Sequence, residues 1–534
     1  MKTNMLDKVI GYISPKTALK RTQDRAKAEV LNKIGMVGEG QGYGQHGASV
    51  QKRSLQGWIS TAGSAIEDIE RNVPKLRERS RDLFMGAPLA TGALRTMVTN
   101  TVGAGLKLNA QVDRTVLKMT PEEADAWETL VEREFQLWAE SEHCDAARMC
   151  DFYQLQQLAF LSMLINGDVF ALTPYKKRVG RPYELTVQLL EADRICSPNG
   201  FENYLDAKVI NGVEVDATGE VVAYHIADKH PKSMQAMENR WKRIEKYGST
   251  SGRQNIIHLL EMERPEQRRG VPVLAPVMEA LKQLTRYTDA ELMAAVISGM
   301  YTLFITSELE DAGDGLGGID MTDEIDSEDD TSIEVGNGAV NFLREGEKVQ
   351  ESNPGRPNTA FEGFVTAICR QIGVALEIPY EVLMKHFTSS YSASRGALLE
   401  AWKMFKRRRA FVATKFCQPI YEEFLTEAVA RGRIYAPGFF DDPIIRRAYS
   451  AAEWNGPTQG QLDPKKEVEA AELRVAGGYP TRTKESIELT GTDFYRNHEH
   501  RVREEELRNA AGLTKEAVKQ EPGEPREEVE EDEN

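Results

Sequence analysis

The sequence predicts a mostly helical α+β protein, and three observations support this fold class. Apolar residues recur at three- and four-residue steps over long stretches, as they do along one face of a helix. Strand-like runs interrupt this pattern between about residues 185 and 260. With 534 residues, the chain is long enough for roughly three or four domains. We therefore expect the strands to lie in a middle domain of an otherwise helical protein.

The first half of the chain carries local signals for particular elements. Residues 1–50 are polar and Gly-rich, so we expect them to be mobile or ordered only in an assembly. Helices should dominate residues 66–101. Thr120, Pro121 and Glu123 form a capping box with Pro at the first helical position, which predicts an amphipathic helix whose apolar residues are Trp127, Leu130, Val131, Phe135 and Trp138. Asn211 and Gly212 should form the two-residue turn of a β-hairpin.

Two striped helices flank an acidic block at the centre of the chain. The first, at residues 271–306, has a narrow apolar face suited to packing against neighbours, and the second is expected at residues 358–382. Between them, residues 307–357 form an excursion with no Lys or Arg from Ser307 to Phe342. Such a block repels itself and stays solvated. Its acidic side chains include Asp311, Asp314, Asp320, Asp323, Glu324, Asp326, Glu328, Asp329 and Asp330.

A loop and a long helix follow the second striped helix. Residues 383–394 lack periodicity and should form the loop, whose polar stretch is Lys385, His386, Phe387, Thr388, Ser389, Ser390, Tyr391 and Ser392. Residues 395–431 should form one long helix, kinked at Pro419. A basic stretch of this helix contains Lys403, Lys406, Arg407, Arg408 and Arg409.

The C-terminal part should be helical and then lose order. Short helices are expected over residues 432–513, with Thr490 opening a candidate capping box that ends at Asp493. Residues 514–534 are rich in Glu and poor in apolar residues, so we expect a disordered acidic tail.

Composition excludes several classes of protein. The net charge of −16 argues against a simple wrap around nucleic acid, because phosphate neutralisation requires clustered Lys and Arg. No apolar stretch reaches the ~20 residues of a membrane helix, and no signal-peptide core opens the sequence, so a soluble protein made in a cytoplasm is expected. Five cysteines without a CxxC pair favour reduced thiols.

We expect no catalytic residues, no cofactor and no metal site. The phosphate loop of nucleotide-binding proteins is absent from the sequence. His143 with Cys144, and His498 with His500, offer metal-ligating atoms, but such close pairs without further partners are more often surface or packing residues.

Several short strings in a fixed order resemble the portal proteins of tailed bacteriophages, the lambda-type family. These strings are RERSRDL (77–83), NTVGAG (100–105), RPEQRRGVP (264–272), GE (346–347), PNTAF (357–361) and YSASRGALLE (391–400). Each string alone is weak, whereas their order and spacing make the match specific. The resemblance extends over residues 50–513.

This resemblance implies a twelvefold ring with an axial DNA channel. In that fold, residues 51–270 resemble the wing, the two striped helices the stem, and residues 307–357 the clip. The loop at residues 383–394 resembles the tunnel loop, and residues 432–513 resemble the crown. A mostly acidic wall with a few basic girdles would let double-stranded DNA slide through.

The implied function is that of a non-enzymatic portal at one vertex of the capsid. It would nucleate the shell with major capsid and scaffolding proteins, dock the terminase, pass DNA during packaging and ejection, and join head–tail connector proteins. The acidic segment would face the motor or adaptor proteins. The protein would be made in the host cytoplasm, reside in the virion and contact no membrane.

The sequence leaves alternatives open both for the basic stretch of the long helix and for the function of the whole chain. The basic residues from Lys406 to Arg409 would form a solvated helix face or pair with acidic residues on a neighbouring subunit. Alternatively, they would form a basic girdle toward DNA or a packing face between subunits. The chain as a whole could be another virion building block, such as an adaptor. A nucleic-acid enzyme would need paired carboxylates such as Asp441 and Asp442, which arise by chance in so acidic a chain.

Overall fold

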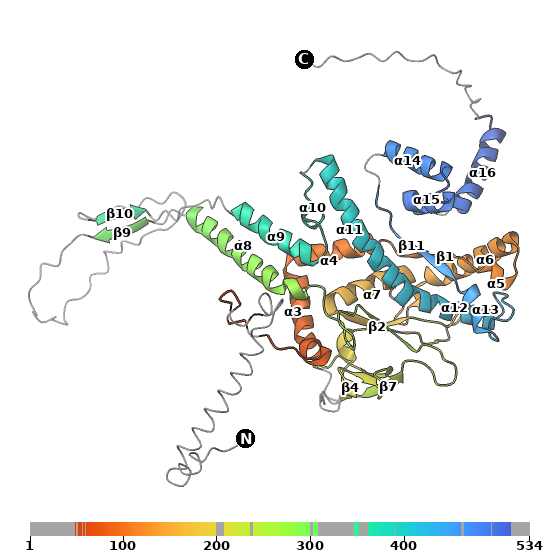
Figure 1. Ribbon diagram of the computed structural model, residues 1–534, viewed down its shortest axis with the longest axis horizontal. Helices are drawn as coiled ribbons and strands as arrows, with labels where there is room; N and C mark the ends of the chain where they lie inside the picture. The colour runs from red at the N-terminus through yellow and green to blue at the C-terminus, as the bar shows by residue number, and fades with distance from the viewer. Residues whose placement is uncertain are drawn as a thin grey trace, which may run out of the picture. The chain divides into compact units, whose positions relative to one another are not determined.

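The structure is a computed structural model that describes residues 49, 52–55, 57, 58, 60–198, 208–234, 239–299, 303–307, 347–351, 361–388, 390–460, 464–492 and 494–513. The chain divides into two units, residues 1–64 and 65–534. In the first unit, the amide of Leu55 donates to the carbonyl of Lys52 and closes a turn. Every helix and strand named below belongs to the second unit. These elements confirm a mostly helical α+β protein (Figure 1).

Most of the N-terminal helices of the second unit begin at a proline or at a capping side chain. They are η2 (Ile66–Glu70), α3 (Val73–Gly86), α4 (Pro88–Thr101), α5 (Arg114–Leu117), α6 (Pro121–Ala139) and α7 (Phe152–Asn166). The predicted capping box is confirmed at α6, where Thr120 and Glu123 bond each other's backbone amides. The predicted apolar face is buried except for Leu130, which is exposed.

Two antiparallel sheets follow. In the first, β2 (Asp168–Leu172) lies between β3 (Gln188–Leu190) and β8 (Ile256–Leu260). In the second, four strands pair in chain order: β4 (Val209–Ile210), β5 (Val213–Val215), β6 (Val221–Ala227) and β7 (Trp241–Glu245). The predicted hairpin turn is confirmed, because Asn211 and Gly212 have φ values of 47° and 78°, which a two-residue turn of this kind requires.

The main core joins residues that are distant in the sequence. Phe135 of α6 makes edge-to-face contacts with Phe152, Tyr421, Phe424 and Trp454, an arrangement that stabilises aromatic clusters beyond their area of burial. The strand β1 (Lys107–Ala110) also pairs antiparallel with β11 (Ala452–Asn455). The expected wing therefore shares one core with the segment that follows the long helix.

The two central helices are shorter than predicted. The first consists of η7 (Ala275–Val277) and α8 (Met278–Gly299), and the second is α9 (Phe361–Ala375). They lie side by side (Figure 1), with Tyr287 stacked on Phe361 at 5.6 Å between ring centroids. Residues 303–306, expected to be helical, instead belong to β9 (Leu303–Ser307), which pairs with β10 (Glu347–Glu351). Residues 308–346 and 352–357 of the acidic excursion lie outside the described residues.

The second central helix ends before the predicted residue 382. After α9, Pro379 separates it from the short helix α10 (Tyr380–Met384). The residue before a proline is disfavoured in the helical region, which explains the break.

The long helix is interrupted near Pro419, as predicted. It consists of α11 (Tyr391–Val412), a π-helical turn η8 (Ala413–Cys417) and α12 (Gln418–Ala430). Pro419 has no N–H to donate to the carbonyl four residues earlier, and a π-turn is one way in which a helix accommodates this loss. Because α11 begins at Tyr391, both Tyr391 and Ser392 lie in its first turn and not in the expected loop.

The C-terminal region contains α13 (Pro443–Tyr449), α14 (Pro464–Ala476), α15 (Arg482–Thr490) and α16 (Phe494–Ala510). The predicted capping box at Thr490 is wrong: Thr490 is the last residue of α15, and Gly491 ends that helix with a φ of 74°. The predicted tail at residues 514–534 lies outside the described residues, as do residues 1–48. Among the described helices, none has both the length and the apolar character needed to cross a membrane.

Candidate functional site

The polar loop between α10 and α11 is held at its first end by a compact turn. Val382 and Leu383 are buried and fix α10 to the core. Lys385 adopts a left-handed backbone conformation with φ 53°, and the amide of His386 donates to the carbonyl of Glu381 at 3.0 Å. This turn ends α10 and directs the chain outward.

The described part of this loop exposes polar and aromatic side chains together. Lys385, His386, Phe387 and Thr388 are all exposed, and half of the Phe387 side chain remains accessible. Ser390 is also exposed, whereas Ser389 and the side chain of Tyr391 lie outside the described residues. Phe387 does not anchor the loop in the core, so a cation, an imidazole and an aromatic ring are available to a partner.

The basic stretch of α11 separates into two groups, of which the first is exposed and paired. Lys403 pairs with Glu400 at 2.6 Å on the same helix. Lys406 pairs with Glu488 of α15 at 3.2 Å, and Arg407 with Glu377 at 3.0 Å. These contacts agree with a solvated helix face, and the acidic partners belong to this chain itself.

Arg408 and Arg409 fasten α11 to α4, and Arg408 is too deeply buried to belong to a girdle toward DNA. Arg408 is only 4% exposed, and its Nη1 contacts Sδ of Met97 at 3.2 Å. Arg409 donates to the carbonyls of Asn100 and Thr101, both at 3.1 Å, at the C-terminal end of α4. A cation at this end of a helix satisfies orphan carbonyls and the helix dipole. Burial lowers the pKa of Arg409 to about 10.

Asp168, the first residue of β2, is a fully buried carboxylate. Its carboxylate accepts hydrogen bonds from Arg77 of α3 at 2.8 Å, from Arg269 at 2.7 and 3.2 Å, and from the amide of Gly270 at 3.0 Å. Nε2 of His258 lies 3.3 Å from the same carboxylate. A buried carboxylate is tolerated when its lone pairs are filled in this way.

The charges of this cluster stabilise one another. Although burial alone would raise it, Arg269 and Arg77 hold the pKa of Asp168 well below its usual range. Burial in turn lowers the pKa of His258, since it disfavours the imidazolium form. Arg269 also donates to the carbonyls of Ala192 at 2.7 Å and Asn211 at 2.6 Å, and thereby ties the two sheets together.

Two glycines, Gly167 and Gly270, allow the backbone before β2 and the backbone before α8 to contact each other beside this carboxylate. A Cβ on Gly270 would lie 1.9 Å from the carbonyl oxygen of Gly167, a distance that no real side chain can adopt. Gly167 itself has φ 90°, and its own Cβ would approach Gly270 to 2.2 Å. Only glycine fits either position. The segment that leads into α8 therefore packs in direct backbone contact with the start of β2.

No role was predicted for these residues, although the sequence contains a signal for some of them. Arg77 belongs to the string RERSRDL, and Arg269 and Gly270 belong to RPEQRRGVP. The structure brings these two distant strings together at Asp168. Asp168 follows an apolar helix and is one of many acidic residues in the chain. Nothing in the neighbouring sequence therefore indicated that it would be buried.

A metal site has little support among the described residues. The one group with ligand geometry comprises Glu191, Asp193 and His230, whose ligand atoms lie within 4.8 Å of one another. The guanidinium of Arg81 already pairs with both carboxylates and supplies the positive charge there. Asp442, considered for a nuclease site, instead caps α13 by accepting from the amide of Ile444 at 2.8 Å.

Comparisons with known proteins give a consistent picture. Residues 51–409 match the family model described as "Phage portal protein, lambda family". The "Portal protein" of Escherichia phage N15 is 25% identical over 505 residues, which cover 91% of this chain and 93% of the relative. "Portal protein B" of Escherichia phage lambda is 24% identical over 497 residues, covering 90% and 91%.

Solved structures were also compared. The neck of a native gene transfer agent particle, computed with C12 symmetry, aligns at 14% identity and a TM-score of 0.40, covering 78% of this chain and 92% of that chain. The virion of a native gene transfer agent particle aligns over the same shares, also at 14% identity, with a TM-score of 0.41.

Proposed function

This chain belongs to the lambda family of phage portal proteins, and from that membership we propose that it forms a twelvefold ring at one vertex of the capsid. The observation that carries the proposal is the family match over residues 51–409, which spans the strand-rich region, both central helices and most of α11. The ring would serve as the channel for DNA packaging and ejection. The family is structural, and we assign no catalytic residue.

We propose that α8 and α9 form the stem of each subunit and contact neighbouring copies. Their outer ends expose apolar side chains in the single chain: Leu292 is 67% exposed, Met293 61% and Phe364 50%. Apolar side chains that gather on an exposed face favour contact with another protein surface. A neighbouring subunit of the ring would cover them.

The acidic segment at residues 311–330 is proposed to face the terminase or connector proteins during assembly. Its support is its charge, because a dense acidic block suits basic partner surfaces. We further propose that the ring meets major capsid and scaffolding proteins, and that the chain is synthesised in the host cytoplasm. Deletion of residues 311–330 tests the docking role, and undiminished terminase binding in a pull-down would contradict it.

The loop between α10 and α11 is proposed to contact DNA in the channel. The support is its exposure: Lys385 and His386 protrude from the turn that ends α10, with Phe387, Thr388 and Ser390 beside them. Such side chains contact phosphate groups without reading sequence. Ser389, Tyr391 and Ser392 complete the proposed contact region.

The experiment replaces Lys385 and His386 by Ala in the phage. We expect normal rings and a reduced amount of packaged DNA, since both side chains are exposed and do not support the fold. The matched control is His500→Ala with Arg501→Ala, an adjacent imidazole and cation that are both exposed on α16. Measurements are ring counts by electron microscopy, phage yield and genome length. Equal DNA content in both variants would rule out the proposed role of the loop.

A further inference from the structure

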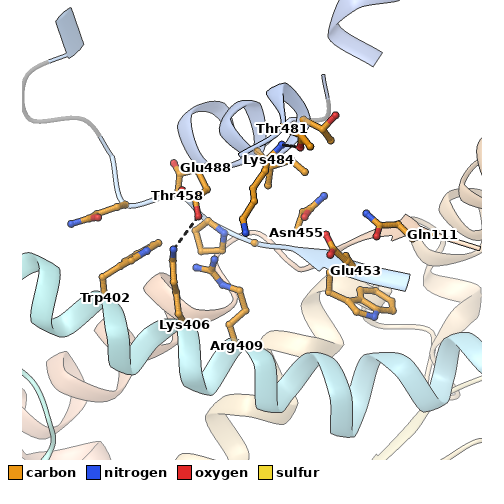
Figure 2. A pocket seen from close by; sticks show the side chains of 16 residues that line it. Gln111, Trp402, Lys406, Arg409, Glu453, Asn455, Thr458, Thr481, Lys484 and Glu488 are labelled. Carbon is orange, nitrogen blue, oxygen red and sulfur yellow. Dashed lines mark hydrogen bonds and ion pairs between the residues drawn. The ribbon is translucent and has the colours of Figure 1, made fainter. Parts of the chain in front are cut away.

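A cavity of about 380 Å³ lies between α11, the segment after β11 and the N-terminal end of α15. Its wall carries three cationic side chains from two helices. Figure 2 shows Lys406 and Arg409 rising from α11 and Lys484 reaching toward them from α15. A neighbouring cavity of about 1020 Å³ shares these three side chains and adds Arg447. The same three cations therefore line both cavities.

Two of these cations have no carboxylate partner within the described part of the chain. Lys406 is paired with Glu488 at 3.2 Å. Among the described residues, Arg409 and Lys484 have no carboxylate within ion-pair distance, and the guanidinium of Arg409 donates to the carbonyls of Asn100 and Thr101. The wall also contains the carboxylate of Glu453. Three cations thus face two carboxylates, so the wall carries one positive charge in excess.

The position of Arg409 at this wall depends on a missing side chain. A Cβ on Gly456 would lie 2.7 Å from Nε of Arg409 and 2.7 Å from Cδ2 of Leu106. Glycine at this position leaves room for the guanidinium beside the cavity. The cation–π contact of Arg409 with Trp402, 5.2 Å from the ring centroid, further fixes its plane.

Neutral donors complete the lining. Thr483 lies in the first turn of α15, and Thr481 caps that helix by accepting from the amide of Lys484 at 3.2 Å. The first amides of a helix have no partner inside the helix and favour an anion. These donors add to the two unpaired cations and would not form a site without them.

We propose that this cavity binds a phosphate group, with Arg409 and Lys484 as its charged donors and Lys406 at its edge. Guanidinium and ammonium groups that converge from different directions suit the tetrahedral oxygens of phosphate. The phosphate belongs either to the backbone of DNA or to a free anion such as inorganic phosphate. The DNA source rests on the proposed channel function, whereas the binding of inorganic phosphate does not.

The first test is calorimetric titration of the full chain with inorganic phosphate at constant ionic strength. Lys484→Gln should weaken phosphate binding about tenfold, because it removes one charge-assisted hydrogen bond. Lys484 is exposed and its ammonium has no partner in the described part, so the variant should fold, which its melting temperature will check. The control is Lys242→Gln, an exposed lysine on β7, which should bind phosphate like the wild type.

The second test uses a fluorescein-labelled DNA duplex of about 20 base pairs, followed by anisotropy at several salt concentrations. If the phosphate comes from DNA, Lys484→Gln weakens duplex binding and lowers the slope of log K against log salt by about 0.9. If free phosphate is the ligand, only the calorimetric affinity falls.

Equal phosphate affinity in Lys484→Gln and Lys242→Gln, or no binding by the wild type, would overturn the proposal. Neither result would affect ring formation, so a failure here is distinct from a failure of the proposed channel function.

Discussion

At the residue scale, Asp168 links segments that are distant from one another in the sequence. Its carboxylate joins Arg77 of α3, Arg269 of the segment before α8, and the strand β8 through His258. The helix that we propose as part of the stem is thereby fixed to the sheets.

Replacement of Asp168 by Asn should destabilise the chain by about 3–5 kcal/mol, because it leaves two buried arginines without their carboxylate. The pKa of Asp168 is lowered in the folded protein, so its stabilising effect is fully present above the unfolded pKa of about 3.9. This effect decreases progressively as the pH falls from that value toward the lower pKa of the folded state. Denaturant unfolding at pH 7 and at pH 3.5 measures both effects.

The control for this variant is Asp125→Asn, an exposed carboxylate on α6, which should change the free energy of unfolding by less than about 0.5 kcal/mol. Similar stability of the two variants at pH 7 would show that the buried cluster does not hold the fold together.

The roles of single residues could be predicted from the sequence where the signal lies within a few neighbouring residues. Thr120 with Glu123, and Asn211 with Gly212, act within four residues, so the sequence alone defined the helix start and the hairpin turn. Arg408 and Arg409 lie next to exposed basic residues, and only the packing of α11 on α4 distinguishes them. The role of Asp168 could not be predicted either, because its partners come from segments that are distant in the sequence.

At the element scale, α8 and α9 are the pair whose exposed faces require an explanation. Their contact through Tyr287, Phe361 and Phe364 covers only part of their apolar surface. The existence of both helices was predicted from periodicity. Their ends were not, because the strand pairing of β9 with β10 and the break at Pro379 depend on non-local contacts and local sterics that compete with the helical pattern.

Replacement of Leu292 and Met293 by Glu should abolish ring assembly and leave the subunit folded. Both side chains are exposed in the single chain, so their loss costs little stability, whereas carboxylates repel each other and resist burial at a subunit contact. Sedimentation velocity measures the assembly, and thermal melting measures the fold.

The same charge change elsewhere provides the comparison. Val179→Glu with Met234→Glu alters two apolar side chains that are also exposed but lie outside α8 and α9, and these rings should form. Rings of normal size in the Leu292/Met293 variant would exclude these helices from the contact.

At the scale of the whole molecule, the fold class followed from the sequence and the connectivity of the core did not. Periodicity and strand-like runs were sufficient for a mostly helical α+β protein. The aromatic cluster around Phe135 and the pairing of β1 with β11 instead join the first helices to residues after α12. The strings that carry the family resemblance are spread through these parts, and RERSRDL and RPEQRRGVP meet only in the folded chain.

The measurement that tests the central claim most directly is electron-microscope class averaging of the purified full-length protein. A portal subunit should give rings with twelve or nearly twelve copies and a central hole wide enough for duplex DNA. Monomers across a range of salt and magnesium concentrations, and also after addition of the scaffolding protein, would contradict the proposed ring and favour an adaptor role.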